Sequence, residues 1–199
     1  GNPDSKYTLE IQGDGTGEVS FNDAVRQAKH IKVSDTILNL GRFTHDDGSV
    51  TEASLDGANL TLAGSTLNLE NGFMQNINLN NFVSSADVKL RADADLASGD
   101  SDRITAAGVA DGSQITLEKL NILADGNADI TLFGNQKAPE IVNLDSFAAF
   151  SADNKYTFST SGNGILQVAS SQNRGLNSVI ADDTLTKSYT VGDSGNISG

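Results

Sequence analysis

The chain has 199 residues, 26 of them acidic and 13 basic, so its formal net charge is −13 and its isoelectric point is near 4.3. This charge repels phosphate backbones and anionic lipid headgroups, which excludes nucleic acid as a partner. No apolar run approaches the roughly 18 to 20 residues of a spanning helix, so we expect no direct membrane insertion by this segment. The absence of cysteine excludes disulfides, thiolate metal sites and thiol nucleophiles.

Glycine, asparagine and aspartate are frequent, whereas proline occurs only twice. These three residue types tolerate a positive φ, so they separate short strands at tight turns. The composition therefore predicts an all-β chain.

Residues 1–85 contain short alternating apolar pairs, such as Leu9 with Ile11 and Leu60 with Leu62. An alternation of period two places such pairs on one face of a strand. Strands this short suit a solenoid, in which each coil buries its inward residues against the coils above and below it. We therefore expect a short-coil β-solenoid over residues 1–85.

Residues 86–175 contain longer strands. Alternating apolar residues from Val88 to Leu96 predict one long strand, and the runs 155–160 and 165–169 flank a Gly-rich turn that is typical of an antiparallel hairpin. We expect a longer-strand solenoid or capping region here, continuous with the first region in one domain. Residues 176–199 resemble the start of a further unit.

Two short stretches also fit helices. Ser20 to Asp23 resembles a capping box that leads into residues 24–29, and residues 145–150 could form one helical turn. Both stretches are short enough to be loops instead.

The runs Leu60–Gly72 and Ile77–Asn81, together with the Gly-rich segment Leu9–Phe21, resemble the passenger domains of bacterial autotransporters. Residues Asp93–Ile104 resemble a stretch that follows such coils in the same family. The resemblance is one of pattern and order over roughly residues 6–170.

The resemblance implies a right-handed parallel β-helix that is exported by type V secretion, as in pertactin-like adhesins. It implies a secreted or surface-exposed virulence factor of a Gram-negative bacterium, tethered by a C-terminal outer-membrane barrel outside this chain. The expected role is a non-catalytic stalk or adhesin with a repetitive polar surface, and the expected partner is a surface protein or glycan of a host or neighbouring cell. Self-association through unpaired terminal strands is a second expected contact. Because the chain starts at Gly1 and its one methionine is Met74, we expect a processed or excised piece.

One segment, Arg42–Gly48, has the residue types of a polysaccharide hydrolase or lyase. Asp46 and Asp47 beside His45 could supply a general acid and a general base. Neighbouring residues on a strand point to opposite faces, so both carboxylates would face one substrate only in a loop. The favoured interpretation is a solvated turn closed by Gly48, without catalytic residues, and the enzyme stays an alternative.

A second segment carries the carboxylates Asp93, Asp95, Asp100 and Asp102. Oxygen ligands at this density can bind calcium, which would make the chain a calcium-stabilised surface-layer module. However, the glycine-rich nonapeptide of calcium-binding β-rolls is missing. The favoured interpretation is a solvated face on which Arg91 and Arg103 neutralise these carboxylates without a metal or other cofactor.

Two further patterns predict surface features. The segment Gly13–Gly17 lacks the Lys-Ser/Thr of a phosphate-binding loop, so it is expected to form a tight turn. The basic residues Arg26, Lys29, Lys32 and Arg42 could contact an acidic glycan, but four cations over seventeen residues usually form a solvated face.

Overall fold

The computed structural model describes residues 1–85, 87–134 and 137–172. These residues form seventeen β-strands and one short 3₁₀-helix, η1 (Leu144–Ser146). The strands are β1 (Tyr7–Gln12), β2 (Glu18–Phe21), β3 (Ala28–Ser34), β4 (Ile37–Leu40), β5 (Arg42–Thr44), β6 (Val50–Glu52), β7 (Asn59–Ala63), β8 (Thr66–Asn68), β9 (Asn76–Ser84), β10 (Lys89–Asp95), β11 (Arg103–Val109), β12 (Gln114–Ala124), β13 (Ile130–Thr131), β14 (Glu140–Ile141), β15 (Ala149–Phe150), β16 (Asn154–Thr160) and β17 (Ile165–Gln172). The all-β class predicted from composition is confirmed. The prediction of a short helix near residues 20–29 is wrong, because β2 ends at Phe21, β3 begins at Ala28, and residues 22–27 between them form a loop.

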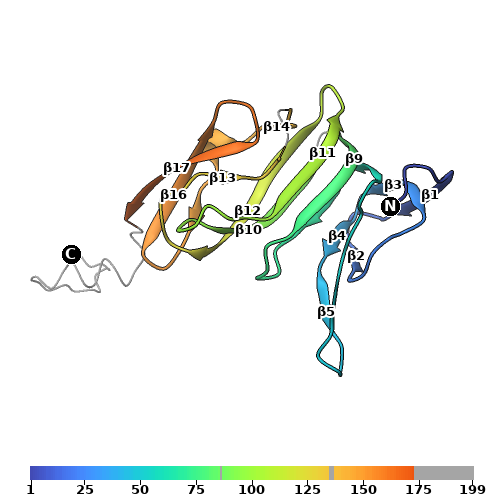
Figure 1. Cartoon of the computed structure of the whole chain (residues 1–199). Coiled ribbons are helices and arrows are strands. Elements are labelled where there is room, and N and C mark those ends of the chain that lie inside the picture. The colour runs from blue at the N-terminus through green and yellow to red at the C-terminus, as the bar shows by residue number, and fades with distance from the viewer. Residues whose placement is uncertain (86, 135–136, 173–199) are drawn as a thin grey trace, which may run out of the picture.

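Two parallel sheets form most of the structure (Figure 1). Sheet A has the order β1-β3-β7-β9-β11, and sheet B has the order β14-β12-β10-β8-β4-β2. Apart from the β5–β6 excursion, the strands from β1 to β12 alternate between the two sheets along the chain. Each strand therefore pairs with the strand that lies one full circuit of the chain before or after it.

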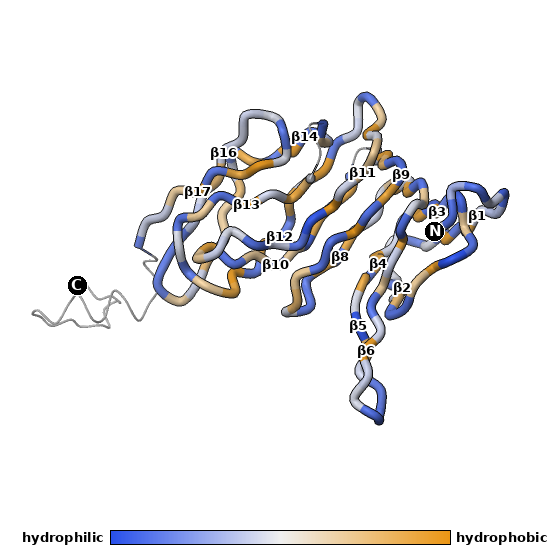
Figure 2. The backbone as a smooth tube through the Cα atoms, viewed as in Figure 1, coloured by the Kyte–Doolittle hydropathy of each residue, from blue (hydrophilic) through white to orange (hydrophobic). Residues whose placement is uncertain are grey.

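Buried residues stack in register between successive strands. In sheet B, Leu38, Leu67, Leu90 and Leu117 are successive register partners, and each is at most 2 % exposed. Burying one such leucine contributes about 1.5–3 kcal/mol. These partners are 29, 23 and 27 residues apart in the sequence, so no constant repeat is visible there. Figure 2 shows hydrophobic and hydrophilic residues alternating along the strands of both sheets.

The corners that lead from sheet A to sheet B share a left-handed backbone conformation. Asp35, Gly64 and Asp87 follow β3, β7 and β9, with φ values of 55°, 57° and 69°. A Cβ atom on Gly64 would lie 2.3 Å from Oδ1 of Asp35, so a side chain at this corner would have to displace the Asp35 carboxylate.

The C-terminal part is an antiparallel sheet with the order β13-β17-β16-β15. The predicted hairpin is confirmed, because β16 and β17 pair from Asn154 with Gln172 to Thr160 with Leu166. The helical turn expected near residues 145–150 is present only as η1. The predicted further unit at residues 176–199 lies outside the described residues.

Candidate functional site

Two buried carboxylates, Asp93 and Asp102, form the most unusual polar cluster and are called the aspartate pair below. Their exposed fractions are 0 % and 1 %. Asp93 lies on β10, and a tight turn with Gly99 at φ 87° returns the chain so that the N–H of Asp102 donates to the carbonyl oxygen of Asp93 at 2.9 Å. Residues nine positions apart in the sequence are therefore in contact.

The loop at residues 70–75 covers Asp93. The N–H groups of Asn71 and Gly72 donate to its Oδ2 at 2.9 and 3.0 Å, and Nδ2 of Asn121 donates to its Oδ1 at 2.8 Å. Three donors thus satisfy both oxygens of this buried carboxylate. Asp93 thus attaches the loop to β10 although alternation directs its side chain outward.

Asp102 attaches the end of the same loop. Its Oδ1 accepts from the N–H of Gln75 at 2.7 Å, and its Oδ2 accepts from the N–H of Asp93 at 2.6 Å. Burial raises the pKa of Asp102 from its ordinary value of 3.8 to about 7, with a smaller contribution from the charge of Asp93, while the two backbone N–H bonds oppose the shift.

A buried carboxyl with a raised pKa is a common feature of catalytic sites. Here both oxygens of Asp102 already accept backbone N–H groups, and the residue is only 1 % exposed. A substrate has no route to these atoms without displacing the loop. The arrangement of the aspartate pair is that of a structural anchor.

The four carboxylates proposed for calcium do not meet at one point. Asp95 accepts the N–H groups of Ala97 and Ser98, of which the Ser98 bond does most to lower its pKa, and Asp100 is exposed. Within residues 1–85, 87–134 and 137–172, no group of three or more His, Cys, Asp or Glu side chains could hold a metal ion.

The prediction of a solvated, salt-bridged face is wrong for the aspartate pair, because both residues are buried. Arg91 pairs instead with Glu118 on β12, with 2.5 Å between Nε and Oε1. The other expected neutralising residue, Arg103, lines an open pocket and forms no ion pair with a described residue.

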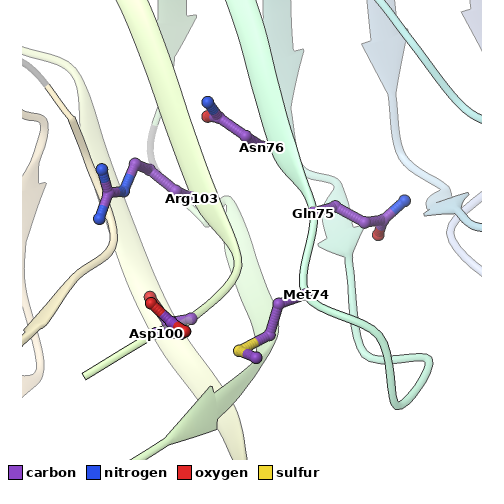
Figure 3. A pocket seen from close by; sticks show the side chains of 6 residues that line it. Met74, Gln75, Asn76, Asp100 and Arg103 are labelled. Carbon is purple, nitrogen blue, oxygen red and sulfur yellow. The ribbon is translucent and has the colours of Figure 1, made fainter. Parts of the chain in front are cut away.

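This pocket lies beside the aspartate pair and has a volume of about 330 Å³ (Figure 3). It is lined by Met74, Gln75, Asn76, Asp100, Ser101 and Arg103. In Figure 3 the side chains of Asp100 and Arg103 lie on the same side of the pocket, whereas that of Gln75 points away from it. Sequence reasoning did not predict this pocket, because its walls come from the 70–75 loop, the start of β9, the turn before β11 and the start of β11.

The candidate catalytic segment, Arg42–Gly48, forms β5 and the tip of the β5–β6 hairpin. His45, Asp46 and Asp47 are all exposed there, and Gly48 has a φ of 86°, as expected for a solvated turn. The hydroxyl and the N–H of Ser49 donate to Oδ1 of Asp47 at 2.6 and 2.9 Å, which lowers the pKa of Asp47. A carboxyl with a lowered pKa is a poor general acid near neutral pH.

The outer faces of both parallel sheets carry asparagines that bond between strands. Nδ2 of Asn68 donates to Oδ1 of Asn39 at 2.8 Å on sheet B, and Nδ2 of Asn80 donates to Oδ1 of Asn59 at 2.7 Å on sheet A. These contacts join residues 29 and 21 positions apart. The abundance of asparagine indicated a polar surface, but only the register identifies the pairs.

The predicted basic cluster is divided by the fold. Arg42 on β5 pairs with Glu52 at 3.2 Å, and the exposed Arg26 lies 4.0 Å from Asp23. Lys32 lies on β3 in sheet A. The Gly13–Gly17 segment forms the turn between β1 and β2, with Gly15 at φ 95°.

Among the described residues, no helix is long and apolar enough to cross a membrane. No family model, no curated protein and no solved structure matches this chain.

Proposed function

We propose that this chain is a non-catalytic β-solenoid segment that acts as a structural stalk and adhesive surface outside the cell. The observation that supports this proposal is the alternation of successive strands between two parallel sheets, with outward rows of amide side chains. Stacked coils extend along one axis by main-chain hydrogen bonds, and a flat polar face can gain affinity by repetition.

The finer features of the proposal follow the resemblance to autotransporter passenger domains. These are a right-handed parallel β-helix, export to the surface of a Gram-negative bacterium, and attachment to a protein or glycan of another cell. The parallel sheets, the unequal circuits of 29, 23 and 27 residues and the acidic surface are compatible with them.

An adhesion assay tests the proposal. Beads coated with this chain should bind epithelial or bacterial cells more than beads coated with serum albumin, which is also acidic. Arginines placed on the outer face of sheet A, at the register partners Asn78 and Thr105, should reduce this binding by blocking the face.

A matched control places arginines at Thr157 and Gln167, which are exposed on the antiparallel sheet. These beads should bind as well as wild type. Wild-type beads that bind no better than albumin beads would overturn the adhesive role, and an equal loss in both arginine pairs would exclude sheet A as the adhesive face.

A further inference from the structure

The β5–β6 hairpin leaves the stacked strands between β4 and β7 and projects away from both parallel sheets (Figure 1). It forms a two-stranded sheet of its own. The circuit that contains it spans 29 residues from Leu38 to Leu67, whereas the next spans 23 from Leu67 to Leu90. The hairpin is thus additional chain that closing the coil does not need.

Both outer edges of this hairpin are open among the described strands, because β5 and β6 pair only with each other. Hydrogen bonds at its two ends fix the pattern: the N–H of His45 donates to the carbonyl oxygen of Ser49 at 2.7 Å, and the N–H of Ala53 donates to that of Gly41 at 2.8 Å. In an antiparallel pair such bonded positions alternate, so the N–H and C=O of Thr44 point to the outer edge of β5. Groups in this position form a template for an added strand.

Apolar side chains lie exposed around this edge. Phe43 is 51 % exposed, and the centroid of its ring lies 5.0 Å from that of His45. Phe73, from the 70–75 loop, is 49 % exposed and lies 4.0 Å below the guanidinium of Arg42. Grouped exposed apolar residues are typical of interaction sites.

The charge of the hairpin indicates which kind of partner it attracts. Arg42 is neutralised by Glu52, whereas Asp46 and Asp47 form no ion pair with any residue that the structure describes. With a net charge of −13 per chain, a second copy is repelled and a cationic segment is attracted. Aromatic faces such as those of Phe43 and Phe73 also accept Lys and Arg side chains.

From these contacts we infer that the hairpin surface, formed by Phe43, His45, Asp46, Asp47 and Phe73, binds an extended basic peptide segment of a partner protein, which adds as a strand to the outer edge of β5. Apolar side chains of that segment pack on Phe43, and its cations meet the carboxylates at the tip. The inference rests on the proposed adhesive role and adds a defined contact to the polar face of sheet A.

Fluorescence anisotropy with a labelled eight-residue peptide of alternating lysine and valine tests this inference. Wild type should bind it more tightly than the same peptide with glutamate in place of lysine. Phe43→Ser and the double variant Asp46→Asn/Asp47→Asn should each weaken binding at least about tenfold. Thr44→Pro should abolish it, since proline removes an outward N–H without breaking a β5–β6 bond.

Matched controls separate this site from general charge attraction. Phe150→Ser alters an equally exposed ring on β15, Asp4→Asn/Asp153→Asn removes two exposed charges elsewhere, and Val50→Pro removes an N–H on the β6 edge. Each control should keep binding within about threefold of wild type. Equal weakening by the two double variants, or unchanged binding in Thr44→Pro, would overturn the inference.

The bead assay distinguishes this failure from failure of the proposed function. If the beads still adhere to cells but the peptide binds all variants equally, the hairpin site is wrong and the adhesive role stands. If the peptide binds at the hairpin but the beads do not adhere to cells, the adhesive role is wrong and the hairpin site stands.

Discussion

The raised pKa of Asp102 makes a quantitative prediction about stability and pH. In the folded state the pKa is about 7, and in the unfolded chain it returns to its ordinary value of 3.8. Between these values the folded state holds a proton that the unfolded state releases. Stability therefore falls as the pH rises from about 4 to about 7, and the contribution of this group levels off above that range.

The linkage relation gives the size of this effect. Between pH 5 and pH 8, ionisation of Asp102 lowers the free energy of unfolding by about 2–3 kcal/mol. Asp102→Asn keeps the size of the side chain and removes the titration. The absolute stability of this variant also reflects a lost hydrogen bond, because an amide nitrogen would face one of the two N–H donors. The pH dependence is free of that contribution.

Urea unfolding, followed by circular dichroism at pH 5, 6, 7 and 8, measures the pH dependence of the free energy of unfolding. Wild type should lose about 2–3 kcal/mol more than Asp102→Asn across this range. Asp47→Asn is the control, because the pKa of exposed Asp47 is lowered and this carboxyl does not titrate above pH 5. Parallel profiles for wild type and Asp102→Asn would refute the reasoning about the buried pair.

Three other outcomes follow from the same structure. Gly64→Ala should lower the free energy of unfolding by about 1–3 kcal/mol because of its positive φ and its contact with Asp35, and less in an Asp35→Ala background; equal losses in urea melts of both backgrounds would rule out the contact. Leu67→Ala should cost about 2–5 kcal/mol, whereas Leu123→Ala, at a site 41 % exposed, should cost less than about 0.5 kcal/mol. Thermal melting should be the same in millimolar calcium and in EDTA, because N–H donors already occupy the oxygens of Asp93; a higher melting temperature in calcium would show a metal site.

Local alternation was enough to predict several elements. The pair Leu60 and Leu62 lies on β7, the run from Val88 to Leu96 contains β10, and the Gly-rich turn near residue 162 joins β16 to β17. Each of these rests on neighbouring residues alone, because side chains of a strand alternate between its two faces.

Local alternation alone could not predict the aspartate pair. Alternation places Asp93 on the outer face of β10, and only the distant 70–75 loop turns that face into a buried one. The β5–β6 hairpin was missed for a similar reason, since strands of three residues are too short to show a period.

The buried pair and the exposed hairpin surface are connected through the 70–75 loop. Asp93 holds the N–H groups of Asn71 and Gly72, and Oδ1 of Asn71 in turn accepts the N–H of Phe73 at 2.9 Å. The ring of Phe73 then lies under Arg42 at the base of the hairpin. A buried carboxylate is a costly way to gain stability, but it fixes one conformation of the groups that it bonds. The position of Phe73 at the hairpin surface thus depends on a residue that is itself completely buried.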